Sequence, residues 1–132
     1  MNRKYTMLAG STLAVLLAAC DQDGAGGLTR QKLMPEAGYV ADADRGEKHF
    51  HDNCARCHGQ QARGSELGPP LVNEVYRPSH HANLAFYWAV RDGVKQHHWQ
   101  FGDMPPIEGL SPQDVADIIA YIRREQRNNG IL

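Results

Sequence analysis

The sequence Cys54-Ala55-Arg56-Cys57-His58 is the segment with the most specific chemistry in this chain of 132 residues. Two thiols three residues apart lie on one side of a helical turn, where each can add to one vinyl group of a haem. The adjacent histidine then projects toward the centre of the ring and can supply a nitrogen ligand to the iron. The segment therefore predicts one haem c attached covalently through Cys54 and Cys57, with His58 as an axial ligand.

Three other kinds of site use a closely spaced cysteine pair, and the sequence favours each of them less than haem attachment. A structural zinc site needs two further ligands, and the chain has no second cysteine pair, although histidines could substitute. A thioredoxin-like redox pair needs a βαβ setting, of which the sequence gives no sign. A plain disulfide is possible, but it would leave the histidine after the second cysteine unexplained.

A candidate for the second axial ligand is Met104, which lies in the sequence Phe-Gly-Asp-Met-Pro-Pro. A methionine thioether is a soft ligand that favours ferrous iron and raises the reduction potential. The two prolines that follow stiffen the loop, so the backbone can hold the weak sulfur ligand near the iron. Most methionines fill hydrophobic cores, but Met104 lies outside any apolar helical stripe, which favours ligation. Met34 also precedes a proline, but it lies before the haem motif and is the poorer candidate.

Three helices are expected to position these groups. The first runs from about Asp44 to the cysteine motif, with Asp42 or Asp44 as its N-cap, and the second covers residues 83–92 and stops at a glycine. The third begins at a Ser-Pro-x-Asp capping pattern, residues 111–114, and ends at the Asn-Asn-Gly sequence, residues 128–130. No segment alternates clearly enough to be a strand, so the chain is predicted to be all-α.

From about Asp42 to the C-terminus, the sequence resembles a class I monohaem cytochrome c. The haem-binding pentapeptide, the Met-Pro loop and a final amphipathic helix occur in the order typical of that family. Gly46 and Phe50 precede the first haem cysteine by eight and four residues, where the family packs its first helix against its last. Ile118 and Tyr121 are the plausible partners, because glycine permits a close approach and an aromatic pair fills the crossing. The resemblance implies a small all-α cytochrome c fold, with three or more helices around one covalent haem.

The resemblance also implies contacts around the haem. Pro70 lies twelve residues after His58. In the family, a proline near that position offers its carbonyl to the outer nitrogen of the haem histidine, so the resemblance assigns this contact to Pro70. Pro69 shares the motif, so the assignment is good to one residue. Candidates for contacts with the haem propionates are Arg77, Trp99 and Tyr76, although each could equally serve packing or the surface.

The N-terminus has the pattern of an export signal, with basic residues before an apolar stretch over residues 7–19. That stretch is shorter than the roughly 20 apolar residues that a membrane span needs. The sequence Leu-Ala-Ala-Cys at 17–20 resembles the lipobox of bacterial lipoproteins, which implies lipidation of Cys20; an ordinary signal peptide with an incidental cysteine is the alternative. We expect a signal peptide over residues 1–19, a tether and extended arm over 20–41, and the cytochrome c domain over 42–132.

The expected function is that of a single-electron carrier outside the bacterial cytoplasm. An iron with two protein ligands has no open position for a substrate, so it gains or loses an electron through the exposed ring edge. A lipid on Cys20 would tether the chain at the periplasmic side of the membrane. Asp21 directly follows this cysteine. In lipoproteins of some double-membrane bacteria an aspartate at that place favours retention at the inner membrane, and the resemblance implies the same location here. The alternatives are a redox subunit permanently docked to a larger oxidoreductase and a small peroxidase-like haem enzyme.

The charge of the chain bears on its partners. The formal net charge is −1 and no run of five or more basic residues occurs, which argues against a nucleic-acid partner. The expected partners are redox proteins that donate or accept the electron, such as a membrane oxidase, a dehydrogenase or a copper enzyme. The lipid anchor would make the membrane a further partner.

Two histidine pairs, His80-His81 and His97-His98, raise the separate question of a copper site or another metal site. Adjacent histidines cannot face the same way on a helix, so each pair is expected to offer at most one convergent ligand without a special turn. The favoured interpretation is therefore a polar surface. A metal site requires that His80 or His81 meet His97 or His98 in space.

Overall fold

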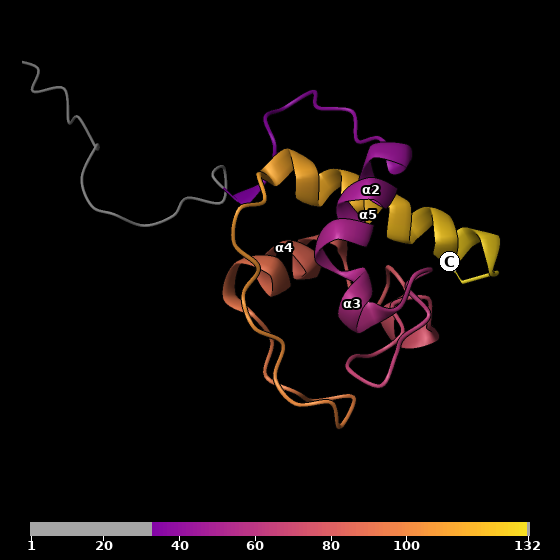
Figure 1. Cartoon of the computed structure of the whole chain (residues 1–132). Helices are drawn as coiled ribbons and strands as arrows, with labels where there is room; N and C mark the ends of the chain where they lie inside the picture. The colour runs from indigo at the N-terminus through magenta and orange to yellow at the C-terminus, as the bar shows by residue number, and fades with distance from the viewer. Residues whose placement is uncertain (1–32, 132) are drawn as a thin grey trace, which may run out of the picture.

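The computed structural model describes residues 33–131, and the only β pairing within them is an isolated antiparallel bridge between Val94 and Met104. The remaining regular structure is helical (Figure 1). In chain order the helices are α2 (Ala43–Asn53), α3 (Ala55–His58), the 3-10 helix η1 (Glu74–Tyr76), α4 (Asn83–Asp92) and α5 (Pro112–Asn128). The prediction of an all-α fold is confirmed.

Local capping signals set the ends of the helices. Asp42 caps α2, because its carboxylate accepts two backbone N–H bonds of 2.9 Å from the first turn. Ser111 caps α5 in a capping box with Asp114, and Pro112 occupies the first turn. Helix α4 ends before Gly93, whose φ of 74° lies in the left-handed region. The three predicted helices are therefore confirmed.

Helix α2 crosses α5 at Gly46 (Figure 1). A β-carbon built on Gly46 would lie 1.8 Å from the backbone oxygen of Asp117 and 2.9 Å from the backbone nitrogen of Ile118, so only glycine permits this approach. Next to this point the buried rings of Phe50 and Tyr121 pack together with their centroids 5.2 Å apart. The expected packing of the first helix against the last is confirmed.

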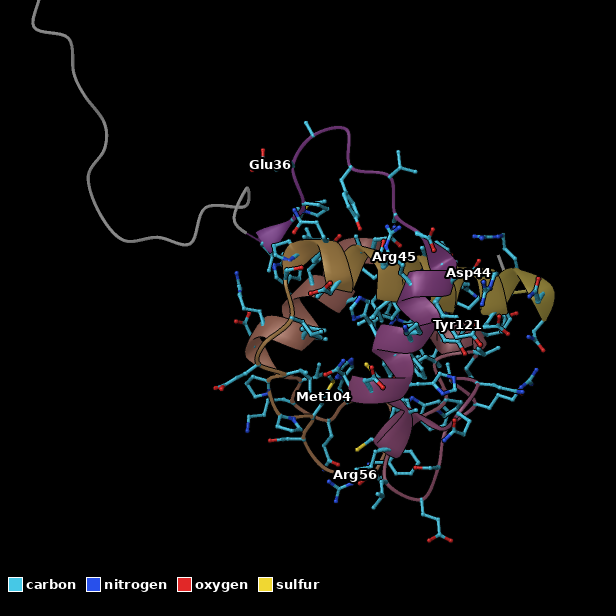
Figure 2. The ribbon with its side chains drawn as sticks, turned by 45° about the horizontal axis from the view of Figure 1, so that its top comes forward. Glu36, Asp44, Arg45, Arg56, Met104 and Tyr121 are labelled. Carbon is cyan, nitrogen blue, oxygen red and sulfur yellow. The ribbon has the colours of Figure 1, made fainter. Side chains whose placement is uncertain are left out.

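The buried carboxylate of Asp117 fastens the arm before α2 to this crossing. It accepts hydrogen bonds from the Tyr39 hydroxyl at 2.9 Å, the Asp42 backbone N–H at 2.7 Å and the Arg45 guanidinium at 2.8 Å. Burial by itself raises the pKa of Asp117, but these hydrogen bonds outweigh it and hold the pKa below its ordinary value. Figure 2 shows Arg45 at the start of α2, close to α5. Within the part of the expected arm that the structure describes, residues 33–41, Tyr39 thus contacts the domain, whereas most of the other residues are exposed.

The signal peptide expected over residues 1–19, the lipidation site Cys20 and the glycine-rich tether lie outside the described residues. Among residues 33–131, no helix combines the length and the apolar character that crossing a bilayer requires.

Two clusters of apolar side chains form the core and leave a cavity beside them. The first cluster joins α2, α5 and the loop after α3, and the second joins α4 to α5. Their buried members are Phe50, Ala55, Ala62, Leu71, Ile118, Tyr121 and Ile122 in the first, and Tyr87, Val115, Ala116 and Ile119 in the second. The two clusters hold α3, α4 and α5 around the site described next.

Candidate haem site

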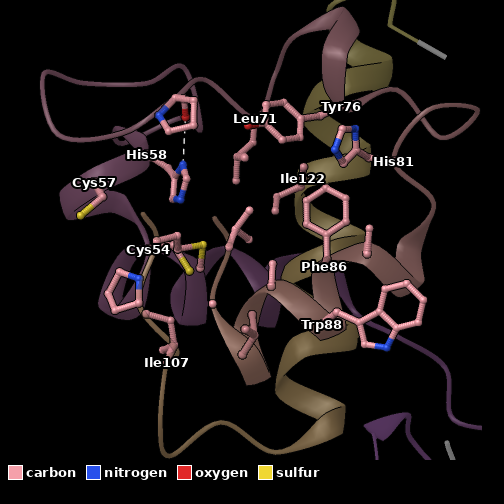
Figure 3. Close-up of a pocket in the computed structure, with 18 of the residues that line it drawn as sticks. Cys54, Cys57, His58, Leu71, Tyr76, His81, Phe86, Trp88, Ile107 and Ile122 are labelled. Carbon is pink, nitrogen blue, oxygen red and sulfur yellow. Dashed lines mark hydrogen bonds between the residues drawn. The ribbon is translucent and has the colours of Figure 1, made fainter. Parts of the chain in front are cut away.

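The cysteine motif lies at the junction of α2 and α3. Cys54 ends α2 and begins α3, and its carbonyl accepts backbone N–H bonds from Cys57 at 3.1 Å and His58 at 2.9 Å. This single turn places both thiols and the imidazole at the wall of one cavity (Figure 3). Cys54 and Cys57 are not joined by a disulfide. Before haem attachment, burial raises the pKa of the Cys54 thiol to about 12, with a smaller contribution from Cys57.

His58 is held in one orientation, with one nitrogen bonded to the protein and the other free. The imidazole is 9% exposed, and its Nδ1 lies 2.9 Å from the carbonyl oxygen of Pro69, as the dashed line in Figure 3 shows. Because a carbonyl only accepts, Nδ1 carries the proton and Nε2 keeps its lone pair. Burial lowers the pKa of His58, and the Pro69 carbonyl opposes this effect only in part. The ring is therefore a neutral ligand with Nε2 available.

The proline contact differs by one residue from the assignment implied by the family resemblance. The carbonyl that faces His58 belongs to Pro69, so the assignment to Pro70 is wrong. The reason is the packing of the loop. A β-carbon on Gly64 would lie 2.8 Å from the Pro70 nitrogen and 3.0 Å from its Cδ, so Pro70 packs on the Gly64 backbone. That contact fixes the Pro69–Pro70 peptide with its oxygen toward the imidazole.

The cavity beside the motif has a volume of about 410 Å³, within the range of about 300–1,000 Å³ typical of small-molecule sites. Figure 3 shows Cys54, Cys57 and His58 on one side and Tyr76, His81 and Phe86 on the other. Its apolar wall comes mainly from α4, α5 and the loops beside them: Leu71, Phe86, Trp88, Ile107, Val115, Ile118, Ile119 and Ile122. Such a wall fits a large apolar ring and keeps water away from it.

Met104 lines the same cavity as His58, but from a separate loop. Its backbone N–H and carbonyl both pair with Val94 at 2.9 Å, and the N–H of Ile107 donates to the Val90 carbonyl at 2.8 Å. Gly93 closes the arrangement, because a β-carbon there would lie 2.4 Å from the Met104 carbonyl oxygen. The end of α4 therefore fixes the Met104 backbone, in addition to the stiffness that the two prolines provide.

The three candidates for propionate contacts divide into two that line the cavity and one that does not. Tyr76 and Trp99 are part of the wall. The buried indole Nε1 of Trp99 makes no hydrogen bond of normal geometry among the described residues, although it lies close enough to the Tyr76 hydroxyl to lower the pKa of that group against the effect of burial. A carboxylate from a molecule in the cavity would give this N–H a full acceptor. Arg77 instead pairs with Glu74 and Ser79 on the surface. The cavity thus fits a haem, whose propionates supply such carboxylates.

The two histidine pairs meet in space, as a metal site requires. The ring centroids of His80 and His98 lie 5.2 Å apart, as do those of His81 and His98, and those of His97 and His98 lie 4.3 Å apart. The expectation of at most one convergent ligand per pair excepted a special turn, and this exception applies to the first pair, because His80 and His81 lie in a turn before α4 and not in a helix.

Comparison with known proteins gives a direct test of the family resemblance. Residues 43–125 match the family described as Cytochrome c. The chain belongs to the cytochrome c family. This cytochrome is 34% identical over 84 residues to a cytochrome c-553-like protein of Synechocystis sp., a match that covers 62% of the chain and 68% of the relative. It is 31% identical over 81 residues to the Cbb3-type cytochrome c oxidase subunit CcoP of Rubrivivax gelatinosus, a match that covers 58% of the chain. The cytochrome spans only 24% of that oxidase subunit.

Family membership establishes the cofactor and the class of function. The cytochrome carries covalently bound haem c, attached in the Cys-x-x-Cys-His arrangement of Cys54, Cys57 and His58. It is an electron-transfer protein and not an enzyme. When bound, the haem supplies a one-electron couple, while the chain supplies attachment, orientation and an apolar surround.

Proposed function

We propose that this cytochrome is a single-electron carrier whose haem iron is ligated by His58 and Met104. The observation that carries the proposal is that these two side chains line one cavity from separate, independently fixed elements. The haem motif fixes His58 through the turn between α2 and α3, whereas the end of α4 fixes the Met104 backbone. Two fixed donors leave the iron without an open position, which favours electron transfer over substrate chemistry.

The residues around these ligands support a ferrous-favouring site. The hydrogen bond from His58 Nδ1 to the Pro69 carbonyl keeps the imidazole neutral and in one tautomer. The apolar wall excludes water and disfavours the additional positive charge of the oxidised state. The thioether of Met104 adds to this preference, because a soft ligand stabilises ferrous iron. The apolar wall and the thioether raise the reduction potential, whereas the Nδ1 hydrogen bond makes the imidazole a stronger donor and acts in the opposite direction.

Substitution of Met104 by alanine should convert the low-spin ferric spectrum of the holoprotein into a high-spin or water-ligated one. The weak iron–thioether band of the oxidised protein should disappear, because the only proposed sulfur ligand is gone. The reduction potential should fall, within the roughly 0.8 V range over which axial ligands act. Optical spectra of both redox states and a potentiometric titration measure these changes.

Met34→Ala is the matched control, since Met34 also precedes a proline but lies in the arm, where it is 37% exposed. This variant should keep the band and the potential of the wild type. A band that survives in Met104→Ala would reject Met104 as the ligand. A histidine ligand or a haem with catalytic character would then have to be considered.

We also propose that the mature cytochrome is a lipoprotein at the periplasmic face of the inner membrane, anchored through Cys20. The support is the resemblance of residues 17–20 to a lipobox, with Asp21 after the cysteine. Several acyl chains on one residue hold a protein to a membrane durably, whereas a single chain binds reversibly. An anchored carrier of this kind would deliver electrons between partners in the same membrane.

Cys20→Ser should move the holoprotein from the membrane fraction of the producing bacterium into the soluble periplasmic fraction. The haem spectrum should be unchanged, because Cys20 is not part of the haem motif. Fractionation followed by haem staining and mass spectrometry of the N-terminus measures both effects. Release of wild-type protein with an unmodified N-terminus would contradict the lipoprotein assignment.

A second candidate function, a subunit docked on a membrane oxidase, is favoured by the likeness to the oxidase subunit CcoP. The same fractionation separates the two functions. A carrier held only by its lipid leaves the membrane in the Cys20→Ser variant, whereas a docked subunit stays with its partner. Retention of this variant that is abolished by high salt or mild detergent would favour the docked subunit.

A further inference from the structure

Three histidines from two separate segments converge at one side of the haem cavity. The candidate ligand nitrogens of His80, His81 and His98 all lie within 4.8 Å of one another, and we call these three residues the histidine cluster. His81 and His98 belong to the cavity wall. Figure 3 shows His81 beside Tyr76, on the side of the cavity away from the cysteine motif. His80 and His98 are exposed, so an ion can reach the cluster from solvent.

One ring of the histidine cluster, that of His81, makes a hydrogen bond that leaves a nitrogen lone pair free for a cation. His81 Nδ1 lies 2.7 Å from the Val75 carbonyl, and His97 Nδ1, beside the cluster, lies 2.8 Å from the Lys95 carbonyl. Each Nδ1 must carry the proton to make such a bond, which leaves the lone pair on Nε2. A ring nitrogen bonded to a carbonyl while the other is free is the usual arrangement of a metal-binding histidine.

The backbone on both sides of the cluster is fixed by other contacts. The buried guanidinium of Arg123 donates hydrogen bonds to the carbonyls of Tyr76 and His81, which holds the turn that carries the first pair. In the second segment, the Asp103 carboxylate pairs with the Lys95 ammonium at 2.5 Å and accepts the Gln96 backbone N–H at 3.0 Å. The convergence therefore does not depend on loose loops, and an ion would find the ligands largely assembled.

We propose that His80, His81 and His98 bind one divalent transition-metal ion of the class to which Zn²⁺ and Cu²⁺ belong. Imidazole nitrogens suit these ions, whereas Mg²⁺ and Ca²⁺ require oxygen ligands that the cluster does not contain. Because a metal–nitrogen bond to Zn²⁺ is about 2.0–2.1 Å, two ligands of one ion lie at most about 4.2 Å apart. Small rotations of the exposed His80 and His98 rings close the remaining difference.

Occupation of this site would connect two segments that border the haem. His98 lies in the loop between Val94 and Met104, whose ends pair with each other, and His80 and His81 lie in the turn before α4. A shared ion adds bonds between these segments, so it should resist opening of the cavity at this side. The site itself rests on the histidine geometry and does not depend on which residue ligates the haem iron.

Titration calorimetry of Zn²⁺, and separately of Cu²⁺, into holoprotein purified without a histidine tag tests the proposal. We expect saturable binding of one ion per chain. His80→Ala and His98→Ala should each weaken the affinity at least about tenfold, the loss typical of disturbing a metal site. His80 is exposed and is not part of the cavity wall, so His80→Ala should retain the wild-type haem spectrum and the metal-free melting temperature.

His51→Ala is the matched control, because it removes an exposed histidine from α2, outside the cluster. This control should bind with wild-type affinity. Equal affinities of wild type, His80→Ala and His98→Ala would overturn the proposal, as would the lack of saturable binding by the wild type. A loss in His51→Ala equal to that in the cluster variants would also overturn it.

Thermal unfolding gives a second, independent measurement. Zn²⁺ should raise the melting temperature of the wild type and of His51→Ala, because an ion that binds only the folded chain stabilises it. The rise should be absent in His98→Ala. Cu²⁺ at less than one equivalent should give an electron paramagnetic resonance spectrum with imidazole nitrogen couplings in the wild type and in His51→Ala, but not in His98→Ala. A rise in melting temperature that persists undiminished in His98→Ala would overturn the proposal.

Discussion

Replacement of Gly46 by alanine should lower the free energy of unfolding of the holoprotein by about 3 kcal/mol. The added β-carbon would lie 1.8 Å from the backbone oxygen of Asp117, a distance that no rotation of a side chain can relieve. Helices α2 and α5 would have to separate, which loosens the contact between Phe50 and Tyr121. Since each kcal/mol shifts the melting temperature of a domain this size by about 4–8 °C, the expected decrease is roughly 12–24 °C.

The sign of this effect makes the prediction specific. At an unconstrained position inside a helix, exchange of glycine for alanine stabilises by roughly 0.5–1 kcal/mol. Lys48→Ala, at an exposed position of α2, is the control and should change the stability by less than about 0.5 kcal/mol. Thermal unfolding followed by circular dichroism, with the haem attached, measures both variants. A Gly46→Ala variant as stable as the wild type would mean that the helices cross elsewhere.

Most of the helical framework could be predicted from the sequence because its signals are local. The capping residues Asp42 and Ser111 satisfy backbone N–H groups within their own first turns, so neighbouring residues alone decide where α2 and α5 begin. The glycine after α4 acts in the same way at its end. The α2–α5 crossing needed more than local signals. It was identified from the spacing of Gly46 and Phe50 before the haem motif, which the family resemblance made interpretable.

The histidine cluster could not be predicted in the same way. The argument that neighbouring histidines diverge holds on a helix, but His80 and His81 lie in a turn, and the turn is set by contacts from distant residues. The segment that carries His98 is placed by its pairing at Val94 and Met104. The approach of two loops depends on tertiary packing, which the residue pattern of either loop does not contain.

Buried polar groups are a second feature that local sequence signals do not reveal. The sequence predicts an amphipathic final helix, but three of its polar residues, Asp117, Arg123 and Gln126, are buried as well. Polar side chains on an amphipathic helix are normally expected in solvent. Their partners include backbone carbonyls and N–H groups at the start of α2 and in the loops around η1, whose positions are known only from the fold. The choice between Pro69 and Pro70 was uncertain for the same reason.

Arg123 makes several of these unexpected contacts. Its guanidinium is 7% exposed and donates to the Tyr76 carbonyl and the Gln126 side-chain oxygen at 2.6 Å, to the Asn83 side-chain oxygen at 3.0 Å, and to the His81 carbonyl. The guanidinium also lies over the ring of Phe86 in the wall of the haem cavity, 4.9 Å from the ring centroid. Burial lowers the pKa of Arg123, and among the described residues no carboxylate pairs with it. One side chain thus connects α5 to the whole segment from η1 to α4.

Arg123→Ala should therefore destabilise the holoprotein by about 3 kcal/mol or more, because each buried polar group left unpaired costs about 1–3 kcal/mol. Arg123→Lys should recover less than half of this loss. The planar guanidinium of arginine donates on several sides, and the single ammonium group of lysine cannot reach all of the same acceptors. The covalent haem should remain attached in both variants, because the attachment residues lie on α3 and not on this segment. Thermal unfolding and the haem spectrum measure these effects.

The matched control is Arg127→Ala, which removes an exposed arginine one turn further along α5 and should change the stability by less than about 0.5 kcal/mol. Both variants lose one positive charge. A difference between their stabilities therefore reports the buried contacts of Arg123 and not the loss of charge. The turn with His80 and His81 should also lose order in Arg123→Ala, so this variant should bind Zn²⁺ more weakly than Arg127→Ala. If the Arg123→Lys or Arg123→Ala variant were as stable as the wild type, the segment from η1 to α4 would be held by its apolar contacts alone.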